Sequence, residues 1–188
     1  FNRCRPMNVS QNGWTGIDEL FAEYIDNILK MDFFKSDNEK SNYTAANDRN
    51  GALRRMMVES IMLSNYPSNY NKNFRKMCEY LTDNASESVF IDFYTLIERI
   101  TPIVNEQTYD LFNTKNSPLI FALFSDFETY GVKDERFGEF LIEFKETLHS
   151  KKVKGVSFDD LNEQKQSKNV NGIMEKLKLL NDLLEEFL

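Results

Sequence analysis

The stretch from Ser117 to Tyr130 constrains the fold more than any other part of this sequence. Its residues are apolar on nearly every side of a helix, which is typical of a helix buried on all faces. Ser117 and Pro118 suit the start of such a helix, and Gly131 suits the position just past its end. We therefore expect an all-α fold, an irregular bundle of about six to seven amphipathic helices around a buried central helix at about 117–130.

Apolar residues at helical spacing recur along the rest of the chain. They predict helices at about residues 15–34, 51–64, 74–81, 89–100, 134–149 and 169–188, and a short helical piece at 106–112. Residues 35–50 show no such periodicity and are dense in Ser, Asn and Asp, which predicts a mobile loop. The expected organisation is the tail end of a missing N-terminal domain (1–14), a first helix (15–34), the loop (35–50) and a helical domain (51–188).

Site chemistry is sparse. The chain has one histidine, His149, two widely separated cysteines, Cys4 and Cys78, and no glycine-rich phosphate loop. We expect His149 to cap a helix or face solvent, and Cys78 to lie in the core. The Asp159–Asp160 pair fits a helix start better than a metal site. The sequence thus predicts no catalytic residue, no metal and no cofactor, and its cysteine usage and lack of a long apolar run favour a cytoplasmic protein.

Charge is unevenly distributed along the chain, whose net charge is −7. Residues 81–150 carry five Lys/Arg and thirteen Asp/Glu, whereas residues 1–80 carry eleven and ten. Nucleic-acid binding needs Lys and Arg concentrated on one surface, because they replace counterions along the phosphate backbone. The candidates are the basic residues of the first half, interleaved with aromatic ones: Arg49, Arg54, Arg55, Lys72, Arg75 and Lys76. The alternative is an ordinary solvated surface of mixed charge.

The acidic middle of the chain suggests a different role. Five carboxylates on and between the helices predicted there would present an acidic face to a basic protein partner: Asp126, Glu128, Asp134, Glu135 and Glu139. This predicts a protein–protein interaction module as the alternative to nucleic-acid binding.

Several short phrases resemble a known family. They are FNRCRPMNVSQ at the start, with Phe1, Asn2, Pro6, Met7 and Gln11, then RRMMVESIML at 54–63, NSPLIFALF at 116–124 and SKNVNGIMEKLKLLNDLL at 167–184. The first phrase resembles the end of the ParB/sulfiredoxin-like domain in the bacterial family that includes GmrSD-type, modification-dependent restriction proteins. The other three resemble the C-terminal helical region that follows this domain.

The resemblance implies a non-catalytic helical domain of a DNA-interacting restriction or phage-defence protein. Any nuclease or NTPase activity would then belong to the missing N-terminal domain, because the family's catalytic motif has no counterpart here. The partners implied are DNA, that missing domain and a second copy bound through the C-terminal helix, with no membrane.

Overall fold

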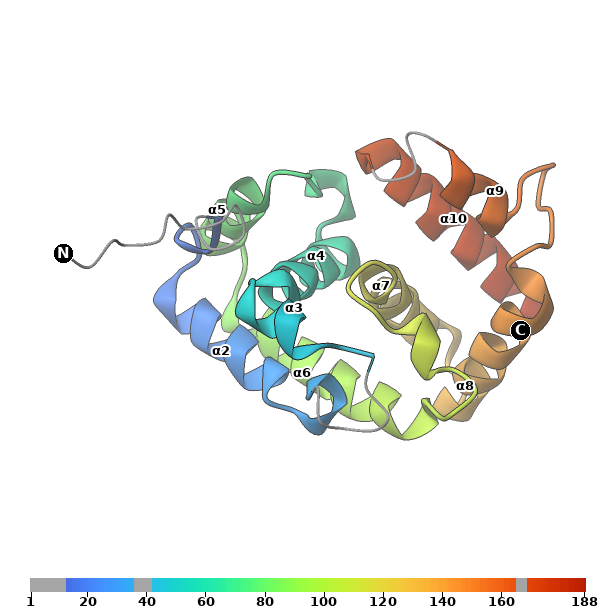
Figure 1. Ribbon diagram of the computed structural model, residues 1–188, viewed down its shortest axis with the longest axis horizontal. Coiled ribbons are helices and arrows are strands. Elements are labelled where there is room, and N and C mark those ends of the chain that lie inside the picture. The colour runs from blue at the N-terminus through green and yellow to red at the C-terminus, as the bar shows by residue number, and fades with distance from the viewer. Residues whose placement is uncertain (1–12, 36–41, 165–168) are drawn as a thin grey trace.

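The computed structural model describes residues 13–35, 42–164 and 169–188 (Figure 1). Over these residues the fold is all-α, as predicted, and its one β feature is an isolated bridge between Val153 and Val156. The α-helices are α2 (Glu19–Leu29), α3 (Ala45–Arg49), α4 (Ala52–Asn65), α5 (Phe74–Asn84), α6 (Glu87–Ile100), α7 (Ser117–Phe127), α8 (Asp134–Glu143), α9 (Phe158–Glu163) and α10 (Val170–Phe187).

The central helix is α7, which confirms the main expectation from the sequence. It lies between α4 and α10 in Figure 1 and packs most extensively on α4. Phe121 is fully buried, and its ring contacts Phe33, Phe93 and Phe112 at centroid distances of 6.1, 5.9 and 5.9 Å. A 3-10 turn extends the helix to Tyr130, and Gly131 ends it in the left-handed region at φ 65°, where glycine has no steric penalty.

The first helix and the predicted loop differ from expectation. Helix α2 begins at Glu19, because the Asp18 side chain accepts hydrogen bonds from the backbone N–H groups of Leu20 and Phe21. Within the predicted loop, residues 45–49 form α3. Tyr43 is buried there and hydrogen-bonded to Ser117 at 2.6 Å. The loop prediction is therefore wrong for residues 45–49, whereas 42–44 and 50 belong to no helix and 36–41 lie outside the described residues.

The predicted helix at 134–149 contains a change of helix type. After α8 the chain continues as a π-helix, Phe144–Leu148, and the His149 N–H donates to the Phe144 carbonyl, five residues back, at 3.0 Å. A turn follows, and Ser157 then starts α9 with a capping box completed by Asp160. The Asp159–Asp160 pair thus marks a helix start.

Helix α10, through which the resemblance implied a second copy, buries most of its apolar stripe within the chain. Leu177, Leu180, Leu183 and Leu184 are buried, and the helix packs on α7 and α9. This stripe is accounted for by packing within the chain. Among the described helices, none combines the length and the apolar character that crossing a membrane would require.

Candidate functional site

The six basic residues of the sequence prediction lie on neighbouring elements. Arg49 ends α3, Arg54 and Arg55 lie in the first turn of α4, Lys72 lies in the turn before α5, and Arg75 and Lys76 lie in the first turn of α5. Both α3 and α5 pack on α4. Figure 1 shows these three helices grouped in one half of the molecule, with α8, α9 and α10 in the other. We call the six residues the basic surface.

Arg54 is held by two partners from the start of the chain. Its Nε and Nη2 atoms donate to the two carboxylate oxygens of Asp26 on α2, each at 2.9 Å. Its guanidinium also lies 4.8 Å from the ring centroid of Trp14, which stacks on Phe74 of α5. Trp14 therefore packs on α4 and α5, while residues 1–12 of the predicted tail lie outside the described residues. Arg54 links α2, α4 and the start of α5.

Arg55 joins α4 to the turn that carries Lys72. It donates to Glu59 at 3.0 Å and to the Lys72 carbonyl at 3.1 Å. On α5, Arg75 donates to Glu79 at 2.7 Å. Three of the six cations thus each face a carboxylate of the same chain. The basic surface therefore combines six cationic side chains with three paired carboxylates, those of Asp26, Glu59 and Glu79.

Arg49 and Lys76 differ from these three arginines. Both side chains are exposed, and neither forms an ion pair with any residue that the structure describes. They are the cations of the basic surface with the greatest freedom to meet an anionic ligand.

Most of the acidic residues at 126–139 form ion pairs or hydrogen bonds with other residues of the chain. Arg99 donates to both oxygens of Asp134, at 2.9 and 2.6 Å, and forms a second ion pair with Glu128. Glu139 pairs with Arg136 at 2.5 Å. Two arginines therefore form ion pairs with three of the five predicted carboxylates.

The other two carboxylates of this set have different surroundings. Asp126 accepts a hydrogen bond from Asn181 at 3.2 Å, and burial raises the pKa of its carboxyl group. Glu135 is exposed and has no ion pair within the described part of the chain. Three of the five residues are thus in ion pairs within the chain, and their role as an acidic face for a partner stays a prediction.

His149 has a carboxylate partner that the sequence prediction missed. Its Nδ1 lies 2.7 Å from Oδ2 of Asp159, at the start of α9. Such a pair could orient an imidazole as a general base, but among the described residues no hydroxyl or thiol hydrogen-bonds to the ring. No group of three or more His, Cys, Asp or Glu side chains suited to a metal ion occurs in the described ranges. The pair ties α9 to the end of the π-helix.

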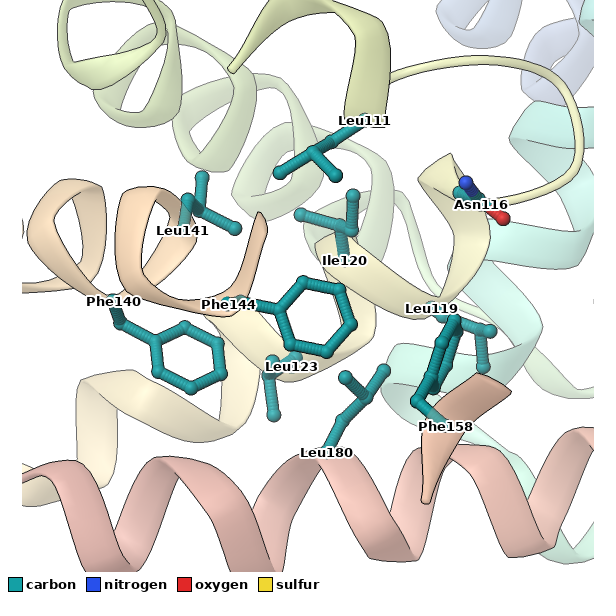
Figure 2. Close-up of a pocket in the computed structure, with 10 residues that line it drawn as sticks. All are labelled: Leu111, Asn116, Leu119, Ile120, Leu123, Phe140, Leu141, Phe144, Phe158 and Leu180. Carbon is teal, nitrogen blue, oxygen red and sulfur yellow. The ribbon is translucent and has the colours of Figure 1, made fainter. Parts of the chain in front are cut away.

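A small apolar cavity lies between α7, the α8 segment, α9 and α10 (Figure 2). Its volume is about 20 Å³, and Asn116 is its only polar lining residue among nine aliphatic and aromatic ones. Ligand pockets are typically about 300–1,000 Å³, and a buried water needs roughly two to four polar partners. We assign the cavity to core packing.

Comparisons with protein-family models, with curated proteins and with solved structures find no match to this chain. The resemblance to GmrSD-type restriction proteins therefore stays a prediction.

Proposed function

We propose that this chain is a non-catalytic helical domain that binds the phosphate backbone of DNA through the basic surface. The observation that carries the proposal is the gathering of cations from three separate segments onto neighbouring helices, in a chain whose net charge is −7. Contacts with phosphates are independent of base sequence and depend strongly on salt. The resemblance to DNA-interacting restriction proteins supports the same proposal.

The ion pairs decide which residues test this proposal. Removing Arg54 or Arg55 would leave Asp26 or Glu59 without its partner, so a loss of binding would mix structural and electrostatic effects. Arg49 and Lys76 carry no such complication, because neither is in an ion pair within the described ranges. They are the informative positions.

We expect Arg49→Gln/Lys76→Gln to weaken binding to a labelled DNA duplex by a similar factor for every sequence tested. Each lost phosphate contact should also lower the slope of log affinity against log salt by about 0.9. Fluorescence anisotropy across a salt series measures both quantities.

The matched control is Lys133→Gln/Lys178→Gln. It makes the same change in net charge at two exposed lysines, one just before α8 and one on α10, in the other half of the molecule. An equal loss of affinity in both double variants would show a general charge effect and contradict the proposed surface. Absence of duplex binding by the unmodified chain at low salt would reject the function itself.

A further inference from the structure

Exposed apolar side chains gather on two adjacent helices, far along the sequence from each other. Leu20 on α2 is 43% exposed, and Ile91 and Tyr94 on α6 are 50% and 39% exposed. Helices α2 and α6 pack side by side (Figure 1). The Tyr24 hydroxyl donates to Glu87 at 2.8 Å, and the rings of Phe21 and Phe90 stack beneath at 4.6 Å.

Helical spacing places these residues toward one shared outer surface. On α2, Leu20 is four residues before Tyr24, which reaches across to α6. On α6, Glu87, Ile91, Tyr94 and Glu98 follow one another at spacings of four, three and four residues, so they share the side that meets Tyr24. We call Leu20 and Tyr24, with these four residues of α6, the α2/α6 face.

The α2/α6 face lies in a strongly acidic part of the molecule. The two helices contribute the exposed carboxylates of Glu19, Glu23, Glu87, Asp92 and Glu98. Their one Lys or Arg is Arg99, which is bound to Asp134 and Glu128. The hydrogen bond to Glu87 raises the pKa of Tyr24, and the charge of Glu23 adds to this, so both carboxylates act on one point of the face. No cation of α2 or α6 is left to offset them.

We propose that the α2/α6 face docks an amphipathic helix of a partner protein, with apolar residues along its centre and Lys or Arg on its flanks. A helix of this kind buries its apolar side against Leu20, Ile91 and Tyr94, and its flanking cations meet the surrounding carboxylates. The face differs from the acidic residues at 126–139, three of which are already paired. The inference is independent of DNA binding by the basic surface.

A helical peptide of leucine and lysine, with leucine at helical spacing, is the direct probe. We expect it to bind the full chain and to shift backbone amide NMR signals of α2 and α6. Ile91→Ser should raise the Kd about tenfold, as is common for residues near the centre of an interface. Glu87→Gln/Glu98→Gln should slow association, most clearly at low salt.

Two controls distinguish binding at this surface from nonspecific binding of the peptide. Val132→Ser alters another exposed apolar residue, 44% exposed between α7 and α8, and should leave the Kd unchanged. A peptide with glutamate in place of lysine should not bind.

The proposal is overturned if the amide shifts map elsewhere, if the glutamate peptide binds equally well, or if Ile91→Ser behaves like Val132→Ser. Sedimentation of the unmodified chain tests whether a second copy of the chain occupies this face. Self-association abolished by Ile91→Ser would assign the face to a second copy instead.

Discussion

Replacing Phe121 by alanine should lower the free energy of unfolding by about 3–5 kcal/mol, the range for removing a well-packed aromatic side chain from a core. Phe121 has no exposed surface and lies on the central helix. Its ring meets rings from α6, from the 3-10 turn after α2 and from the turn before α7. Its removal therefore loosens several elements at once. Urea unfolding followed by circular dichroism measures the change.

Tyr94→Ala is the comparison for this experiment, because it also removes an aromatic ring, but from a side chain that is 39% exposed. We expect it to cost less than about 1 kcal/mol, as for most surface substitutions. Similar losses for the two variants would show that α7 is not the centre of the core.

Alkaline pH should destabilise the protein partly through the Cys78 thiol. Burial raises the pKa of this thiol from 9.0 to about 12, with a smaller contribution from the charge of Glu79. Above pH 9 the unfolded chain releases the thiol proton while the folded chain retains it, so stability falls as pH rises toward the folded pKa. By pH 11 this loss amounts to roughly 2–3 kcal/mol from Cys78 alone.

Cys78→Val isolates this contribution, because it replaces the thiol with a small apolar group that does not titrate. Free energies of unfolding for both proteins between neutral pH and pH 11 give two curves. Burial also raises the pKa of Tyr43 and of Tyr70, so both curves should fall. The free energy of unfolding of the unmodified protein should fall further, by the contribution of Cys78. Parallel curves would contradict a buried, protonated thiol.

Long periodic helices were predictable, and short ones were not. The apolar runs around 117–130 and 169–188 span three or more turns, enough for a pattern to emerge. Helix α3 has five residues, too few to define a face. Tyr43 stands among polar residues, and its contacts with Phe33, Phe34 and Ser117, the last 74 positions away, show that the segment is packed.

The residues of the candidate site could be predicted from the sequence, but the ion pairs that they form could not. The sequence indicated that the cations of α4 and α5 form a positive strip if the two helices adjoin. The hydrogen bond from Arg54 to Asp26 joins residues 28 positions apart, and no local sequence pattern predicts it. The α2/α6 face was missed for a similar reason, since Leu20 and Ile91 each appear as one residue of an ordinary amphipathic helix until the two helices are placed side by side.

The π-helix after α8 has a consequence for the rest of the chain. Each residue of an α-helix turns the path by about 100°, and a π-helix bonds residue i to residue i+5, so the turn at residues 144–148 accommodates one residue more than an α-helical turn would. Deleting one exposed residue there, such as Glu146, would restore an uninterrupted α-helical path. Because the π-helical turn absorbs the extra residue, His149 should keep roughly its direction toward Asp159 after such a deletion. A single-codon deletion in this turn is therefore absorbed locally, whereas a deletion within α8 would turn the residues beyond it by about 100°.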